Sequence, residues 1–129
     1  MDKAQALHSF WSSFGLPAID EQSAYDDGTL EQLGIAFPYI SYETATDYLD
    51  GPVMLGADLW YKSTSWADIT RKADAIGDYI GLGGKVIRYQ GGGLWVCRST
   101  PFAQRMAEDT WADNIRRIHI NIQAEFLSA

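Results

Sequence analysis

Three side chains in this sequence are possible soft ligands for a transition metal, and the same groups could take part in a Ser–His or Cys–His catalytic pair: His8, His119 and Cys97. They lie far apart in the sequence, so none of the close spacings used by zinc and other transition-metal sites is present. A Ser–His or Cys–His catalytic pair would depend on the fold to bring its members together, and no spacing indicates one. We therefore expect no metal, no cofactor and no enzymatic activity.

Two further segments superficially suggest ligand binding. Gly81-Leu82-Gly83-Gly84-Lys85 is similar to a phosphate-binding loop, but Val86 stands where a Ser or Thr should ligate magnesium. The segment also leaves a predicted helix and enters a strand, which reverses the order of such a loop, so we interpret it as a helix stop and a turn. Asp26-Asp27-Gly28 lacks the alternating oxygen ligands of a calcium loop and is typical of a turn.

The charge of the chain is negative and unevenly distributed. The net charge of −7 disfavours nucleic-acid binding, because phosphate neutralisation needs a basic patch. Residues 1–58 hold ten acidic residues and one lysine, a net charge of −9, whereas residues 59–129 hold seven acidic and nine basic residues, a net charge of +2. Such a split favours head-to-tail association through complementary patches. The alternative is a solvated acidic surface with chance clustering.

Length and composition predict one domain over residues 1–129, since 47% apolar residues are enough to fill a core. No apolar run approaches the roughly 20 residues of a membrane span. The first residues, Met1 to Ala4, do not begin a signal peptide. Cys97 is the only cysteine, so an internal disulfide is impossible and we expect synthesis in a reducing cytoplasm.

Apolar periodicity predicts two helices. The first spans Ala4 to Phe14, and Gly15 and Pro17 are placed to end it; its apolar side chains recur at spacings of three and four: Leu7, Phe10, Trp11 and Phe14. The second begins at Ser65-Trp66-Ala67-Asp68, which resembles a capping box. One stripe of that helix carries Ile69, Ala73, Ile76 and Ile80. Residues 29–33 have the composition for one further helical turn.

Alternation and β-branched or aromatic content predict five strands: residues 37–44, 53–63, 85–90, 94–99 and 116–126. The last strand turns Ile118, Ile120, Ile122, Ala124 and Phe126 toward the core. Residues 101–115 are predicted to be a loop or a short helix. The expected fold is α+β, a mixed but mostly antiparallel sheet of about five strands packed with two helices, in the order α-β-β-α-β-β-β.

Several residues are candidates for an interface. Trp60 lies on the polar side of its strand beside Asp58 and Lys62, where it either contacts a partner or is covered by another part of the same chain, such as the first helix. Gly91-Gly92-Gly93 is predicted to be a flexible hairpin tip that becomes ordered on a partner. Four arginines on predicted strands of the last third could meet the acidic half of a second copy: Arg88, Arg98, Arg116 and Arg117.

The layout of these elements is distinctive over nearly the full length. It combines an N-terminal helix bearing Phe and Trp with Gly15-Leu16-Pro17-Ala18, and it ends in an Ile-x-Ile strand. Between them come Phe37-Pro38-Tyr39-Ile40-Ser41-Tyr42-Glu43, Leu59-Trp60-Tyr61, a helix starting near Trp66, and Ile87-Arg88-Tyr89. In this layout the chain resembles small phage tail-completion proteins of the tail-terminator type.

The resemblance implies a structural protein of a phage or prophage virion, assembled in the bacterial host cytoplasm. Such a protein forms a homo-oligomeric ring, often a hexamer, that caps the tail tube and joins it to the head. Its expected partners are further copies of itself, the tail-tube protein and the head–tail connector proteins. Two alternatives stay open: a related neck, connector or tail-tube subunit, and a small-molecule binding domain or enzyme with an aromatic pocket.

Overall fold

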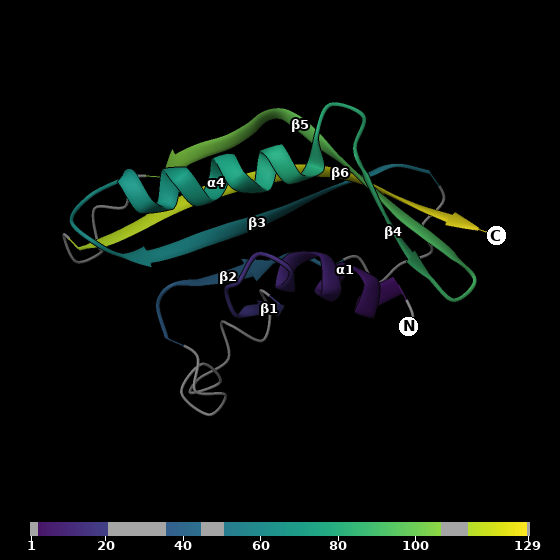
Figure 1. The fold of residues 1–129 in the computed structure, drawn as a ribbon, viewed down its shortest axis with the longest axis horizontal. Coiled ribbons are helices and arrows are strands. Elements are labelled where there is room, and N and C mark those ends of the chain that lie inside the picture. Colours follow the sequence, from purple (N-terminus) through teal and green to yellow (C-terminus); the bar gives the residue numbers. More distant parts are fainter. Residues whose placement is uncertain (1–2, 21–35, 45–50, 107–113, 129) are drawn as a thin grey trace.

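The computed structural model describes residues 3–20, 36–44, 51–106 and 114–128 (Figure 1). It confirms an α+β fold with two helices and a mixed sheet. The elements in chain order are α1 (Lys3–Ser12), β1 (Ala18–Asp20), β2 (Tyr39–Tyr42), β3 (Val53–Lys62), α4 (Ala67–Ile80), β4 (Lys85–Tyr89), β5 (Gly92–Met106) and β6 (Ile115–Ser128).

The sheet has six strands in the order β1-β2-β3-β6-β5-β4, one more than the sequence predicted. Its neighbouring strands are antiparallel except for β1 and β2, which pair in parallel. The additional strand is β1, whose three residues are too few to show an alternating pattern. The predicted order therefore gains one strand directly after the first helix.

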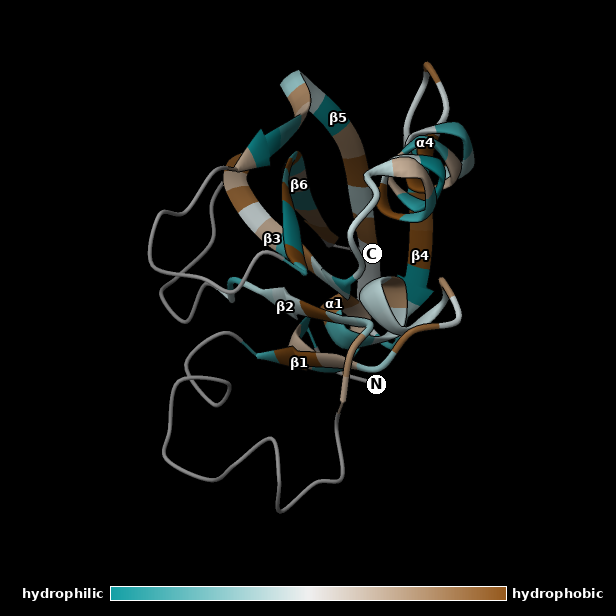
Figure 2. Ribbon diagram, turned by 90° about the vertical axis from the view of Figure 1, so that its left-hand side faces the viewer, coloured by the Kyte–Doolittle hydropathy of each residue, from teal (hydrophilic) through white to brown (hydrophobic). Residues whose placement is uncertain are grey.

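The core lies on one face of this sheet. In the register of β3 and β6, Leu55 pairs with Ile122 and Leu59 with Ile118, and all four side chains are buried. The apolar stripes of both helices join the same cluster through Leu7, Phe10, Trp11, Ile69, Ala73, Ile76 and Ile80. Figure 2 shows α1 and α4 on the same side of β3 and β6. We call this side the helix face and the opposite side the outer face.

Helix α1 links the two edges of the sheet. It contacts both β1 and β4, which are the outermost strands of the described sheet. Its aromatic residues also reach α4, where the rings of Phe14 and Tyr79 meet edge to face at 5.3 Å. Helix α1 therefore covers the core from one edge of the curled sheet to the other. This position explains why Phe10 and Trp11 are almost completely buried.

Three local predictions were wrong. Residues 101–106 are neither loop nor helix but the continuation of β5, which keeps pairing with β6 after a shift in register between Arg98 and Ala103. The hairpin turn is Gln90-Gly91, because Tyr89 pairs directly with Gly92; Gly92 and Gly93 therefore belong to β5. No side chain caps α4 at Trp66, and the Ser65 hydroxyl instead accepts a hydrogen bond from the N–H of Ala67.

The remaining predicted elements are correct in type and differ at their ends. The first helix ends at Ser12 rather than Phe14, and the first aromatic strand covers only Tyr39–Tyr42. The final strand is longer than expected at both ends. The predicted helical turn at residues 29–33 lies outside the described residues. None of the described helices has the length and apolar character needed to cross a membrane.

Candidate functional site

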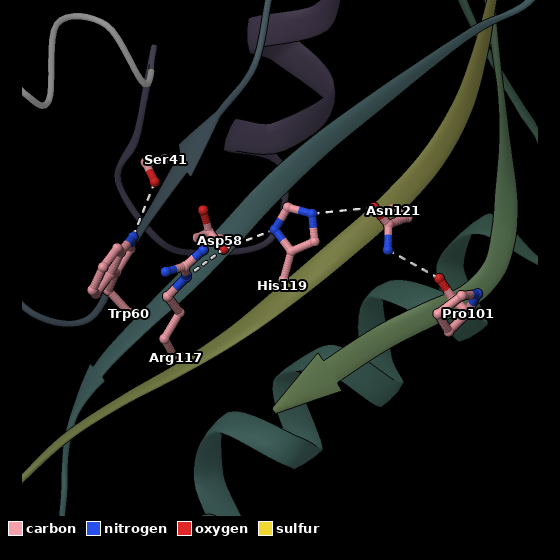
Figure 3. Close-up of polar contacts among 7 residues, drawn as sticks. All are labelled: Ser41, Asp58, Trp60, Pro101, Arg117, His119 and Asn121. Carbon is pink, nitrogen blue, oxygen red and sulfur yellow. Dashed lines mark hydrogen bonds and ion pairs between the residues drawn. The ribbon is translucent and has the colours of Figure 1, made fainter. Parts of the chain in front are cut away.

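A row of polar side chains crosses the outer face of the sheet (Figure 3). Asp58 on β3 stands directly opposite His119 on β6, and its Oδ1 atom lies 2.9 Å from His119 Nδ1. The same oxygen accepts a hydrogen bond of 2.7 Å from Arg117 Nε. On the far side of the imidazole, His119 Nε2 lies 3.1 Å from Asn121 Oδ1, and Asn121 Nδ2 donates to the carbonyl of Pro101. We call these residues the Asp58 network.

The contacts of His119 favour its charged form. Asn121 uses its Nδ2 group on the Pro101 carbonyl, so its Oδ1 faces the histidine as an acceptor. Both ring nitrogens therefore face oxygen acceptors, and only a doubly protonated imidazole can donate to both. The hydrogen bond to Asp58 raises the pKa of His119 above its ordinary value, although burial acts in the opposite direction.

This geometry suits a structural cation better than a catalytic base. A general base or a metal ligand needs a ring nitrogen with an available lone pair, and the network occupies both nitrogens. Asp58 is itself buried, with 6% of its side chain exposed, beneath the guanidinium and the imidazole. The network therefore neutralises a buried carboxylate and ties β3, β6 and β5 together across the sheet.

The other candidate chemical groups are separate from this network. His8 contacts the hydroxyl of Tyr42 through Nδ1 at 2.9 Å and that of Ser12 through Nε2 at 3.1 Å. Burial raises the pKa of the Cys97 thiol, with a further contribution from Glu125, which disfavours a reactive thiolate. Within the described ranges, no three His, Cys, Asp or Glu side chains form a group able to hold a metal ion.

Two shallow grooves border Arg98 and Phe102. One, of about 330 Å³, is lined by Leu82, Cys97, Arg98, Ser99, Thr100 and Phe102. The other, of about 280 Å³, lies between α4 and β5 and is lined by Ala73, Asp74, Gly77, Asp78, Arg98 and Phe102. Neither lining contains a histidine, so neither groove combines an imidazole base with a nucleophile.

Trp60 is held by its own chain. Its indole N–H donates to the Ser41 hydroxyl at 3.0 Å, the Tyr39 ring stacks on it at 6.1 Å, and the Arg117 guanidinium lies 5.4 Å from its ring centre. These contacts come from β2 and β6 on the outer face and not from α1. The partners of Trp60 in the structure therefore belong to its own chain, as the second of the two interpretations expected. Trp60 nevertheless stays partly exposed.

The four candidate arginines do not form one cluster. Arg117 belongs to the Asp58 network, whereas its neighbour Arg116 points to the helix face, donates to the Thr64 carbonyl and lies over the Trp66 ring. Arg88 is exposed on β4, opposite Gly93. Arg98 is exposed on β5, where the register of that strand begins to shift. The structure thus pairs Trp60 with Arg117 and Arg88 with Gly93.

The candidate glycines differ in role. Gly91 has a φ of 93°, which suits the tight turn between β4 and β5. Gly93 is buried within β5, where an added Cβ would come within 3.3 Å of Val86 Cγ1. Only Gly91 of the three therefore occupies the turn.

Sequence reasoning missed two groups of outer-face residues. One is the Asp58 network, and the other is a set of exposed apolar side chains: Met54, Val86, Trp95 and Leu127. The alternation of the strands placed Asp58 and His119 away from the core, but only the strand register brings them together.

No protein-family model matches the sequence, and no curated protein matches it. Among solved structures, the fold is similar to that of a chain described as "Virion of native gene transfer agent (GTA) particle". The TM-score is 0.54, the sequence identity is 20%, and the match covers 97% of this chain and 91% of that chain. At this identity the likeness shows a shared fold that extends over almost the whole of both chains.

Proposed function

We propose that this chain is a structural component of a phage or phage-like virion. In this role it is a tail-completion protein that forms a homo-oligomeric ring, caps the tail tube and joins the tube to the head. Its partners are further copies of itself, the tail-tube protein and the head–tail connector proteins. The proposed location is the tail of the virion, after assembly in the cytoplasm of the host.

The observation that carries this proposal is the fold likeness, over 97% of the chain, to a protein of a virion particle. Fold likeness alone is an analogy, because one fold can serve many functions. Here it agrees with the independent resemblance of the sequence layout to tail-terminator proteins. Within the described residues, the polar groups of the outer face hold the sheet together, which fits a structural role.

The test is end-binding to tail tubes. The purified protein is added to tubes polymerised from the tail-tube protein of the same genome, and the tubes are imaged by electron microscopy. A tail-completion protein is expected to form a ring at one end of each tube and to stop further growth. Tubes with bare ends at saturating protein would contradict the proposal.

The same preparation separates the proposed role from its nearest alternative. A tube subunit should polymerise into long stacks by itself or extend the existing tubes, whereas a terminator stops after one ring. A connector or neck subunit should bind the head vertex and leave isolated tubes unbound. Phage heads are added to the same preparation, so that each outcome is visible in the images as tube length, tube ends and bound heads.

A further inference from the structure

The side chain of Asn121 connects the buried polar row of the outer face to an irregular part of β5. The register of β5 against β6 shifts over residues 99–102, which we call the β5 bulge. Asn121 on β6 reaches this segment, because its Nδ2 group donates to the Pro101 carbonyl at 3.1 Å. Figure 3 shows how the contacts lead from His119 through Asn121 to Pro101.

The β5 bulge forms a wall that the two shallow grooves share. Ser99, Thr100 and Phe102 line the groove of about 330 Å³, and Phe102 also lines the groove of about 280 Å³. The Phe102 ring packs closely on α4, since a Cβ added at Gly77 would lie 3.1 Å from it. Phe102 thus anchors the bulge on the helix face, and the Pro101 carbonyl anchors it on the outer face. The position of the bulge therefore sets the shape of both grooves.

The direction of the Asn121 amide depends on the proton of His119. When both ring nitrogens are protonated, Nε2 donates to Asn121 Oδ1, and Asn121 Nδ2 is directed at Pro101. A neutral ring has a single N–H, and it stays on Nδ1, because the opposite tautomer would set a lone pair against the Asp58 carboxylate at 2.9 Å. In the neutral ring, Nε2 then presents a lone pair to Asn121 Oδ1, so that two acceptors face each other.

A rotation of the Asn121 amide relieves this repulsion. The Nδ2 group then donates to His119 Nε2, but Oδ1 turns toward the Pro101 carbonyl, which is also an acceptor. The hydrogen bond that holds the β5 bulge is lost in this arrangement. The bond from Arg117 to Asp58 does not involve the imidazole, so β3 and β6 stay joined.

The groups that face the imidazole come from four strands or their ends: Asp58 on β3, Arg117 on β6, Gln104 on β5 and Glu43 directly after β2. Glu43 reaches the ring over Gly56, where an added Cβ would meet both Glu43 Oε1 and His119 Cε1. Within the described residues, the ring thus faces two carboxylates and one guanidinium. The hydrogen bond to Asp58 raises the pKa of His119 above 6.5, while burial and Arg117 act against it.

We propose that His119, Asn121 and Pro101 form a proton-controlled switch of the β5 bulge. The protonated ring holds the bulge against β6, and the neutral ring releases it, which alters the shared wall of the two grooves. The switch operates within one subunit, so it goes beyond the proposed ring and does not depend on it.

An NMR titration of the full chain from pH 5 to pH 9 tests the switch. The ring nitrogens of His119 report its protonation, and the carbonyl carbon of Pro101 reports the hydrogen bond that this carbonyl accepts. Both signals are expected to move with one midpoint, above pH 6.5. Across the same range, the protection of the β5 bulge amides against hydrogen exchange should fall by about three- to tenfold, the effect of one hydrogen bond. A Pro101 signal that stays constant while His119 titrates would overturn the proposal.

Three variants separate the switch from a merely structural contact. Asn121→Asp can accept from His119 but cannot donate to Pro101, so its Pro101 signal should match that of the parent at high pH and stay there at every pH. His119→Gln removes the titrating ring and should abolish the response. His8→Gln removes the other histidine of the chain and should leave the response unaltered.

Each variant has an outcome that contradicts the proposal. The proposal fails if the Pro101 signal of His119→Gln still follows pH, because another group would then control the bulge. It also fails if Asn121→Asp responds like the parent. Should His119→Gln not fold, Asn121→Asp decides alone, since it keeps the imidazole and its bond to Asp58.

Discussion

Asp58 and His119 are direct cross-strand partners on the outer face, and their side chains meet at 2.9 Å. The row continues to both sides, since Asp58 also stands opposite Ser41 on β2, and His119 opposite Gln104 on β5. A single polar row thus spans four strands on the face opposite the apolar core. Because the carboxylate is buried, its two cationic partners decide whether the row stabilises or destabilises the fold.

Replacing Asp58 with Asn should destabilise the protein by on the order of 2–3 kcal/mol. The change keeps the shape of the side chain but leaves Arg117 and His119 without their counter-charge. The cost is expected to stay below the roughly 3–5 kcal/mol of a fully buried broken pair, because both partners retain some solvent contact. Urea denaturation measures it, and Asp74→Asn on the exposed side of α4 should change stability by less than about 0.5 kcal/mol.

The stability of the fold should depend on the protonation of His119. Its pKa in the folded state lies above the ordinary value of 6.5, so the folded state binds the proton more tightly than the unfolded state does. The contribution is fully present below pH 6.5 and is lost as the pH rises through the higher, folded-state pKa. The free energy of unfolding, measured from pH 5 upward, should therefore decrease across this window.

His119→Gln is the control for this pH dependence, because it removes the titrating ring and keeps a hydrogen-bonding side chain. The variant should be less stable than the parent at low pH and should show a flatter profile above pH 6.5. An unchanged slope in the variant would mean that another group is responsible.

The sequence predicts the core better than the contacts of the outer face. Burial follows from the alternation within one strand, whereas contacts between strands depend on their register. Period-two apolar residues identified the buried side of β6, and Ile118, Ile120 and Ile122 are indeed fully or almost fully buried. The Asp58 network depends instead on which residue of β3 faces which residue of β6. A shift of two positions would place Asp58 opposite Arg117 or Asn121 instead, and the alternation of the two segments does not distinguish these registers.

The errors at β1 and β5 also have physical causes. β1 is a three-residue strand formed by pairing with β2, so tertiary contacts create it rather than local preference. In β5 the shift in register between Arg98 and Ala103 interrupts the alternation of buried and exposed residues. Pro101 lies within the shifted stretch, and a proline usually stands at the start of a strand, on an edge strand or at a bulge. The strand nevertheless resumes, because β6 continues to offer hydrogen-bonding partners up to Met106.

Two adjacent glycines should respond very differently to alanine. Gly84 has a φ of +84°, and an added Cβ would come within 2.7 Å of the Val96 carbonyl oxygen and 2.8 Å of Cys97 Sγ. Backbone strain and this contact together are expected to cost about 1–3 kcal/mol. Gly83 has open space around it, so Gly83→Ala should be close to neutral. Thermal unfolding of both variants tests the turn, and equal melting temperatures would contradict its geometry.

The purified protein should contain no stoichiometric transition metal. Both ring nitrogens of His119 are engaged by Asp58 and Asn121, and those of His8 by the hydroxyls of Tyr42 and Ser12. Elemental analysis after purification without chelators measures the content directly. One equivalent of zinc, copper or iron per chain that persists after dialysis would refute this prediction.

Ile120→Asp should unfold the protein or come close to it. Ile120 has no exposed surface, pairs with Ala57 at the centre of the sheet and belongs to the core beneath both helices. An aspartate there would be an unpaired charge in an apolar site, with an expected cost on the order of 4 kcal/mol or more. Gln123→Asp is the matched control, since residue 123 lies on the exposed side of the same strand. If both variants melted at the temperature of the parent, β6 could not lie at the centre of the core, and the register from which the Asp58 network is derived would be wrong.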